Sequence, residues 1–408
     1  MSNTLNLGTD GNWAVKKDSL LGYNSENGNF KPLAFNFTRA SSATVVNKAG
    51  LIETVGSGEP RIDYKDDSKG ALLLEPTRSN SLLQSNQFNT TWTLSASIDL
   101  TSGKSGVGGS NNAWLLKKSG SGARYIQQTL SLSSAQYSCS FYLKAESTNW
   151  AIIWCYDGTT ASEAYFDLEN GVVGNTGGSN FNDATIENVG GGWYRCTLTY
   201  TSSTTFVRVY PAFDNGSVGA NTDDGIYIQN AQLEQGSYAT SYIPTQGSAV
   251  TRVADVCTGA GNDTVFNSLE GVIYLEIPAI NSQDNGNFIS INGGSATNGA
   301  FIRIDYGSNK VVFYYNFNNT SQGVQSAIDW DFTIDNKLAF SYEENRFVSA
   351  RNGVIIGSVL SGSVASESTL NDFSFSNGSG AGFKGSIKNV VIENLSKTNA
   401  ELIALTSL

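Results

Sequence analysis

The stretch Gly225–Thr245, GIYIQNAQLEQGSYATSYIPT, decides how we divide the chain. Its first ten residues place Ile226 and Ile228 at alternate positions, which is typical of a half-buried strand. Glycine and serine interrupt this pattern after Glu234, and Pro244 favours an extended conformation at the residue before it. The stretch therefore predicts that a β-domain closes with a strand here and that the chain leaves it through an extended exit segment.

The composition predicts an all-β protein with more than one domain. The chain has 408 residues, which is too long for one ordinary core. Its 43 glycines separate short alternating runs of valine, isoleucine, tyrosine and phenylalanine, and helix-forming runs are almost absent. We therefore predict tandem β-sandwiches with one short helix at the C-terminal end.

Changes in residue composition and in the spacing of apolar residues predict five consecutive segments. Residues 1–32 are polar with isolated apolar anchors, and we expect either a loose attachment arm or a strand-and-loop cap. Residues 33–81 predict a small β module, 82–245 a first sandwich, 246–263 a linker and 264–408 a second sandwich. The similar phrases FTRAS and VTRVAD suggest that the linker pairs with the N-terminal strands, which would make the first sandwich an insertion.

Charge and residue usage disfavour several classes of function. The formal net charge is −11, and the absence of a Lys/Arg cluster disfavours nucleic acids and anionic membranes as partners. The chain has no histidine, which excludes a Ser-His-Asp triad and an H-E-x-x-H zinc site. Apolar runs are too short to cross a membrane, and the polar residues after Met1 do not predict a signal peptide. We therefore expect a non-enzymatic protein that is made in the cytoplasm and is not inserted in a membrane.

The four cysteines predict buried thiols. Cys139, Cys155 and Cys196 share the apolar face of their predicted strands, and neither they nor Cys257 form a C-x-x-C pair. A disulfide remains open, although reduced thiols are favoured for a protein made in the cytoplasm.

The opposite faces of the same strands predict a candidate binding strip. If the cysteines point inward, large aromatic and arginine side chains point outward. These are Tyr142, Trp154, Tyr156, Trp193, Arg195, Arg208 and Tyr210. Aromatic faces suit the C–H surfaces of sugars and guanidinium groups suit hydroxyls or carboxylates, but such residues also form interfaces and buried layers. Glycan contact and structural packing therefore both remain open.

Two charged regions have a functional and a structural interpretation. In the N-terminal module, three arginines lie among carboxylates, which predicts a charged ligand pocket or, preferably, structural ion pairs. The residues are Arg39, Arg61, Arg78, Glu53, Glu59, Asp63 and Glu75. A later loop offers oxygen ligands for calcium but lacks a specific spacing, so we expect a solvated loop and no cofactor. Its residues are Asp214, Asn215, Asp223 and Asp224.

Several long phrases resemble a family of bacteriophage virion proteins. They include FTRASSATVVNKAGLIE, EPRIDY, GALLLEPTRSN, FYLKAES, GGWYRCTLTY and NAQLEQGSYATSYIPT, within about residues 1–257. Proteins of this family are described as tail-fibre or tail-associated proteins with carbohydrate-binding-like modules. The resemblance implies a carbohydrate-binding-module-like jelly roll for the first sandwich.

The last third of the chain resembles concanavalin-A-like and laminin-G-like lectin sandwiches. The resemblance rests on the Asn352–Gly353 hairpin signal and on a final strand of the pattern G-x-I-x-x-V-x-I that begins at Gly385. Thr398 and Glu401 predict a capping box for the helix that follows. Glycosidases on such folds can use an E-x-D-x-x-E strand, and the carboxylates present do not form one. They are Glu276, Asp329, Asp331 and Asp335.

Together, the resemblances imply a virion protein with other virion proteins as partners. One expected function is adhesion, by a tail fibre or a head fibre, to glycans of a host or its environment. The alternative is a structural capsid-decoration or tail protein whose sandwiches only pack, and a polysaccharide-degrading tailspike is disfavoured. We expect a homo-oligomer, and the family analogy suggests a trimer, although no heptads or β-helix repeats specify the number.

Overall fold

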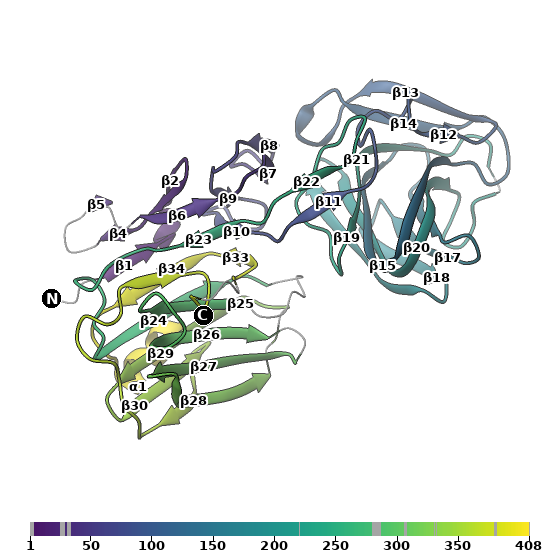
Figure 1. Cartoon of the computed structure of the whole chain (residues 1–408). Coiled ribbons are helices and arrows are strands. Elements are labelled where there is room, and N and C mark those ends of the chain that lie inside the picture. Colours follow the sequence, from purple (N-terminus) through teal and green to yellow (C-terminus); the bar gives the residue numbers. More distant parts are fainter. Residues whose placement is uncertain are drawn as a thin grey trace. The chain divides into compact units, whose positions relative to one another are not determined.

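The computed structural model describes residues 4–24, 29–30, 34–219, 221–279, 287–305, 308–329, 331, 333–378 and 382–407. These ranges hold antiparallel strands and one α-helix, α1 (Asn399–Thr406), which confirms the predicted class of tandem β-sandwiches with a C-terminal helix (Figure 1). The first strand predicted for the small β module, Leu33–Ala40, begins at a residue that lies outside the described ones.

The chain forms two compact units that do not follow one another along the sequence. Unit 1 consists of Met1–Lys48, Val55–Pro76 and Val253–Leu408, and unit 2 consists of Ala49–Thr54 and Thr77–Arg252. The N-terminal segments therefore share a unit with the second sandwich, and the first sandwich is inserted between them. The segment predicted as a linker carries strands β22 (Val250–Arg252) and β23 (Val256–Thr258), and β23 pairs with β6 (Phe35–Thr38) in the N-terminal region.

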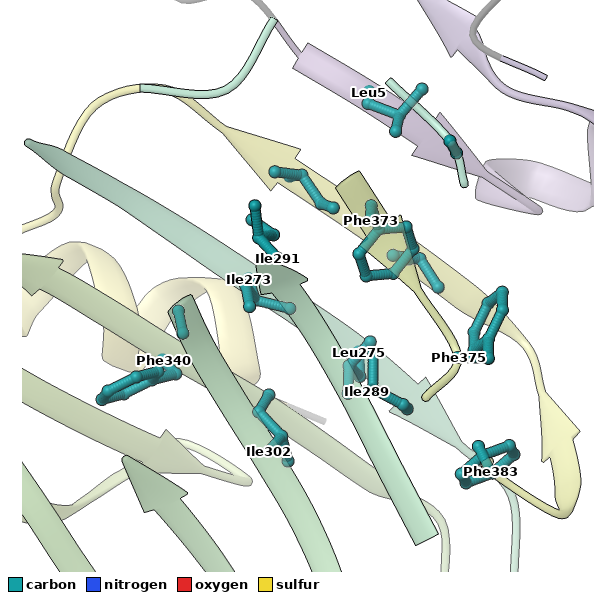
Figure 2. Packing of buried hydrophobic residues seen from close by; sticks show 14 of the residues in the cluster. Leu5, Ile273, Leu275, Ile289, Ile291, Ile302, Phe340, Phe373, Phe375 and Phe383 are labelled. Carbon is teal, nitrogen blue, oxygen red and sulfur yellow. The ribbon is translucent and has the colours of Figure 1, made fainter. Parts of the chain in front are cut away.

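Two large antiparallel sheets build the sandwich of unit 1. One has the order β31 (Val354–Val359), β30 (Arg346–Arg351), β29 (Asn336–Glu343), β24 (Glu270–Ile277), β34 (Asn389–Glu393), β1 (Thr4–Leu7), β4 (Tyr23–Asn24), β5 (Asn29–Phe30). The other has the order β28 (Thr320–Asp329), β27 (Lys310–Phe317), β26 (Gly299–Asp305), β25 (Asn287–Asn292), β32 (Asp372–Ser374). Ile273 and Phe340 of the first sheet pack with Ile289 and Ile302 of the second in one apolar core (Figure 2). Because β1 pairs with β34, the N-terminal segment is part of this sandwich from its first described residues.

Smaller elements extend this core. They are β2 (Ala14–Lys16), β3 (Ser19–Leu21), β6 (Phe35–Thr38) and β23 (Val256–Thr258) in one sheet, β33 (Gly385–Ile387), β10 (Ala71–Leu74) and β9 (Arg61–Asp63) in another, with β7 (Ala43–Val46) and the 3-10 turn η1 (Thr9–Gly11). Phe35 and Leu72 join the same apolar core. The predicted capping box at Thr398 and Glu401 is confirmed, and Leu402 packs helix α1 against the sheet.

Unit 2 is a sandwich whose two sheets are continuous through two long strands. Strand β8 (Ile52–Val55) belongs to unit 2 as far as Thr54. The other elements of unit 2 are β11 (Arg78–Asn80), β12 (Thr93–Leu94), β13 (Ile98–Lys104), η2 (Val107–Gly109), β14 (Ala113–Lys118), β15 (Ile126–Ala145), β16 (Trp150–Tyr156), β17 (Ala161–Asp167), β18 (Val172–Gly177), β19 (Phe181–Gly190), β20 (Trp193–Ala212), β21 (Gly225–Gln235) and β22 (Val250–Arg252). The alternation of side chains predicts separate strands at Tyr125–Leu130 and Tyr137–Ala145 in place of β15, and at Trp193–Thr201 and Thr205–Phe213 in place of β20. Each is instead one strand of 20 residues, because the two run antiparallel to each other through the expected turns.

The change of register near Leu132 divides both long strands into halves. We call the sheet of β13, β14, β21, the second half of β15, the first half of β20 and β19 the first half-sheet. The second half-sheet contains β12, the first half of β15, the second half of β20, β16, β17 and β18. Cys139 and Cys196 of the first and Cys155 of the second lie in one apolar core, so the outer faces of the two half-sheets lie on opposite sides of the unit. All four cysteines of the chain are buried free thiols, as predicted.

Candidate functional site

The seven residues of the predicted strip do not lie on one surface. Tyr142, Trp193 and Arg195 lie on the outer side of the first half-sheet, where Tyr142 and Arg195 are register partners. The other four, Trp154, Tyr156, Arg208 and Tyr210, lie on the outer side of the second half-sheet. Strand parity was sufficient to exclude all seven from the central core, but it could not show that β20 contributes its two ends to opposite faces.

The three residues on the first half-sheet are buried, which corrects their prediction as ligand contacts. Tyr142, Trp193 and Arg195 are 6%, 3% and 7% exposed. Tyr142 and Trp193 pack with Val107 of the turn η2 in a small apolar cluster. The Arg195 guanidinium donates to Ser140 Oγ over 3.1 Å and lies 5.6 Å from the Tyr142 ring. The packing interpretation therefore applies to this face.

A polar row crosses four strands on the outer side of the second half-sheet. Gln127 of β15 pairs in register with Arg208 of β20, Arg208 with Trp154 of β16, and Trp154 with Glu163 of β17. These residues alternate with core residues such as Ile153 and Val207, which fixes them on the outer side. All four side chains are half-buried, so each combines an ordered position with access to solvent.

Aromatic rings flank this row. Tyr156 and Phe206 are register partners one step along the strands, and their ring centroids lie 4.9 Å apart. The rings of Trp154 and Tyr156 are nearly parallel, at 9° and 5.2 Å, and the ring of Tyr125 lies against the guanidinium of Arg208. We call Tyr125, Trp154, Tyr156, Phe206 and Arg208 the aromatic face. Sequence reasoning missed Phe206, although it has the same parity as Arg208, and it missed Tyr125, the first residue of a predicted strand, which lies just before β15.

Arg208 is held at the centre of the aromatic face by neutral groups. Its guanidinium carbon lies 4.0 Å from the Tyr125 ring centroid, 4.4 Å from that of Phe206 and 4.8 Å from that of Trp154. Its Nε donates to Gln127 Oε1 over 2.7 Å and its Nη1 to the Tyr210 hydroxyl over 3.2 Å. Cation–π contacts and two hydrogen bonds therefore fix one orientation of the side chain.

One end of the aromatic face is closed by packing. Ile152, Tyr165 and Tyr210 are buried with the partly buried Val218. Burial raises the pKa of Tyr210, and it also raises the pKa of Tyr165. Both phenols therefore remain protonated at neutral pH. The part of the aromatic face that solvent can reach is formed by Tyr125, Trp154, Tyr156 and Phe206.

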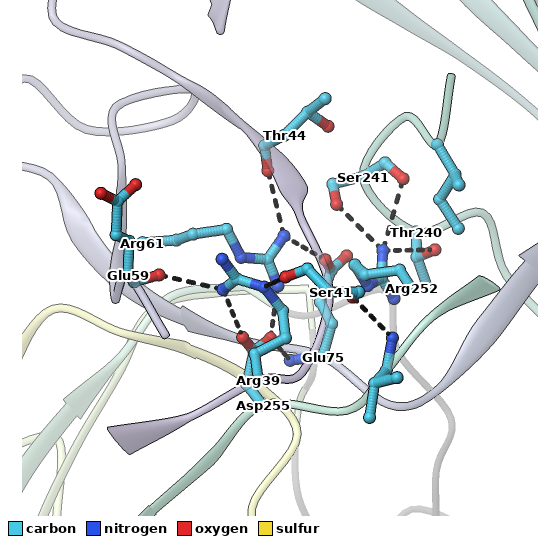
Figure 3. Close-up of polar contacts among 12 residues, drawn as sticks. Arg39, Ser41, Thr44, Glu59, Arg61, Glu75, Thr240, Ser241, Arg252 and Asp255 are labelled. Atoms are coloured by element: carbon cyan, nitrogen blue, oxygen red, sulfur yellow. Dashed lines mark hydrogen bonds and ion pairs between the residues drawn. The ribbon is translucent and has the colours of Figure 1, made fainter. Parts of the chain in front are cut away.

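The charged N-terminal residues form a structural cluster, as favoured from the sequence. Arg39 Nη1 lies 2.9 Å from Asp255 Oδ1, Arg61 pairs with the other oxygen of Asp255, and Arg61 Nη1 lies 2.6 Å from Glu75 Oε2 (Figure 3). The side chains of Arg39, Arg61 and Asp255 are fully buried. Asp255 could not be predicted as the partner because it follows Arg61 by 194 positions. Arg78 belongs to unit 2, where it stacks 5.4 Å from the Tyr238 ring.

The acidic residues considered for metal binding or catalysis have other roles. Asp224 pairs with Lys118 over 2.9 Å, whereas Asn215 Oδ1 accepts from the amide of Asn175. In unit 1, Asp335 pairs with Lys388, and the exposed Asp331 accepts from Thr333. Across the described ranges, no group of three or more His, Cys, Asp or Glu side chains is placed to hold a metal ion. The side chain of Asp329 is outside the described side chains.

No helix in the described part of the chain combines the length and the apolar character needed to cross a membrane.

Comparison with known proteins gives only distant structural similarities. No family model and no curated protein matches the chain. One similar structure is domain 4 of AbnA, a GH43 extracellular arabinanase from Geobacillus stearothermophilus, in complex with arabinotriose (13% identity, 42% of this chain and 83% of that chain, TM-score 0.31). A second is the CBM40 of a Ruminococcus gnavus IT-sialidase bound to α2,3 sialyllactose (18%, 37% and 94%, TM-score 0.28). A third is the LG4-5 pair of the mouse laminin α1 chain (12%, 66% and 92%, TM-score 0.23). With identities and TM-scores this low, these similarities assign neither a family nor a ligand.

Proposed function

We propose that unit 2 is a non-catalytic glycan-binding module and that saccharides bind to its aromatic face. The observation that carries this proposal is the half-buried row Gln127, Arg208, Trp154 and Glu163, flanked by aromatic rings on a rigid sheet. Saccharides present apolar C–H surfaces beside hydroxyl groups. Aromatic rings match the former, and amide, carboxylate and guanidinium groups match the latter.

The packing of the aromatic face supports binding without a large ordering cost. Trp154, Tyr156 and Phe206 restrain one another through ring contacts of 4.9–5.5 Å. Side chains that are already ordered lose little rotamer freedom when a ligand binds. A site on strands is also more rigid than a site on loops.

We propose adhesion as the biological role of this binding. The support is the resemblance of several sequence phrases to phage virion proteins, which suggests a tail or head fibre that attaches to glycans in company with other virion proteins. An oligomer would multiply weak single sites through avidity.

A glycan array followed by titration tests the proposed function. We expect the full chain to bind saccharides, and Trp154→Ala to weaken binding about tenfold or more, as for a central aromatic contact. The matched control is Phe213→Ala, which removes a 42% exposed ring of the same unit and leaves binding unchanged. The proposal fails if the folded chain binds no glycan, or if both variants weaken binding equally.

A further inference from the structure

We infer that the aromatic face selects acidic saccharides and that Arg208 pairs with their carboxylate or sulfate group. This inference rests on the proposed function and specifies its ligand class. It is drawn from the hydrogen bonds that Arg208 makes and from its N–H donors that have no acceptor among the described residues.

The guanidinium of Arg208 has unused donors. Arginine carries five N–H donors, and the structure assigns one on Nε to Gln127 and one on Nη1 to Tyr210. The remaining three, on Nη1 and Nη2, have no acceptor among the described residues, and no described carboxylate lies within ion-pair distance. Neighbouring donors on Nη1 and Nη2 match the two oxygens of a carboxylate or sulfate.

Arg208 differs in this respect from three partly or fully buried cations of the described residues, although the buried Arg195 is likewise held by a hydroxyl and a ring. Lys118 pairs with Asp224 over 2.9 Å, Arg61 with Glu75 over 2.6 Å and Arg346 with Glu343 over 2.9 Å. Arg208 is instead held by an amide, a phenol and three rings. The charge of a half-buried cation is incompletely compensated when no anion lies beside it. An anionic ligand therefore gains more binding free energy at this site than at an exposed arginine.

Glu163 determines the orientation in which an acidic saccharide is expected to bind. It lies on the opposite side of Trp154 from Arg208, because the register runs Arg208, Trp154, Glu163 across three neighbouring strands. A negative group on the ligand is repelled at Glu163 and attracted at Arg208, whereas hydroxyl groups can donate to Glu163. A saccharide ring over Trp154 is therefore expected to direct its acidic group toward Arg208.

Titration calorimetry of the full chain with matched probes tests the inference. The probes are an oligogalacturonate, its neutral methyl ester and a sulfated oligosaccharide of the same length. We expect at least one acidic probe to bind about tenfold or more tightly than the ester. The carboxylated and sulfated probes show which anion is preferred. We expect the preference for the acidic probe over the ester to disappear in Arg208→Gln and to be partly kept in Arg208→Lys. The control is Lys144→Gln, which removes a cation from the opposite face and should leave the preference unchanged.

The outcomes separate this inference from the proposed function. Equal binding of acidic and neutral probes, lost in Trp154→Ala, overturns the acidic preference and leaves the glycan-binding proposal intact. An equal loss of acidic and neutral binding in Arg208→Gln, with an unchanged unfolding transition, also overturns it. Failure of the wild-type chain to bind these probes and any glycan of the array contradicts both.

Discussion

At the scale of single residues, Asp255 balances the charge in the interior of unit 1. It accepts from Arg39 and Arg61, and its second oxygen also accepts from the amide of Glu75 over 2.8 Å. Two buried guanidinium groups therefore share this carboxylate, and Arg61 also pairs with Glu75. A buried ion pair adds little net stability compared with apolar packing, but loss of one partner leaves a buried charge uncompensated.

We predict that Asp255→Asn lowers the free energy of unfolding of unit 1 by about 3–5 kcal/mol. The measurement is urea unfolding followed by a probe in unit 1. The control is Asp10→Asn in the same unit, which removes an exposed pair with Lys69 and should change stability by less than about 0.5 kcal/mol. Similar small losses in both variants would contradict the structural role of the cluster.

Asp63 predicts a pH dependence of stability. Burial raises its pKa from 3.8 to about 6. Since the folded state holds this proton more tightly, the stabilisation is fully present below about pH 4 and is lost as pH rises through 6. Asp63 is only half-buried, so we expect solvent screening to limit the loss to about 1 kcal/mol. Unfolding of wild type and Asp63→Asn from pH 4 to 7 should give a stability difference that changes by this amount, and a constant difference would contradict the prediction.

At the scale of elements, the long strands β15 and β20 determine what the sequence could predict. Alternation of side chains was sufficient to find their inner residues, such as Cys139 and Val207, and the outer position of Arg208. It could not show that each strand continues through a polar stretch and bends, because that depends on pairing between residues far apart, such as Gln136 with Thr201. The predicted single strip was wrong for this reason, and the four residues on the second half-sheet were predicted without their neighbours Tyr125 and Phe206.

The helix α1 gives a prediction at this scale. The Glu401 amide donates to Thr398 Oγ1, and the Thr398 amide donates to Glu401 Oε2. Thr398→Ala removes the cap, which is worth about 1 kcal/mol, so hydrogen exchange of the Glu401 amide should become about fivefold faster. Glu401→Gln keeps the Thr398 hydroxyl as acceptor and should leave that amide protected. Unchanged exchange in Thr398→Ala would show that packing of Leu402 alone protects the first turn.

At the scale of the whole molecule, unit 2 is an insertion whose two ends meet. Arg78 of β11 and Arg252 of β22 are register partners. Within unit 1, the amide of Asp255 donates to the carbonyl of Glu75 over 2.9 Å, so the two sides of the insertion point lie together there as well. The similar phrases FTRAS and VTRVAD predict an insertion. Its ends lie outside the predicted boundaries at 82 and 245, and they are located only by the pairing of β11 with β22 and of Asp255 with Glu75.

We predict that residues 77–252, which are unit 2 without Ala49–Thr54, fold alone, and that the rest of the chain folds when a short linker joins Pro76 to Val253. Each piece should unfold cooperatively in calorimetry. A fragment of residues 82–245 is the control. It lacks the buried Asn80, which donates to the carbonyls of Ala231 and Ile243, so it should be less stable than 77–252. Aggregation of both pieces would contradict the division into two units.

The indole N–H signals of the seven tryptophans offer the most direct measurement of the central claim, that the outer side of the second half-sheet binds saccharides. In an NMR titration of the full chain with a saccharide that it binds, the signal of Trp154 should move, while those of the buried Trp92 and Trp193 should stay in place. Movement of the Trp193 signal with Trp154 unchanged would place the ligand on the opposite side of unit 2 and contradict the account.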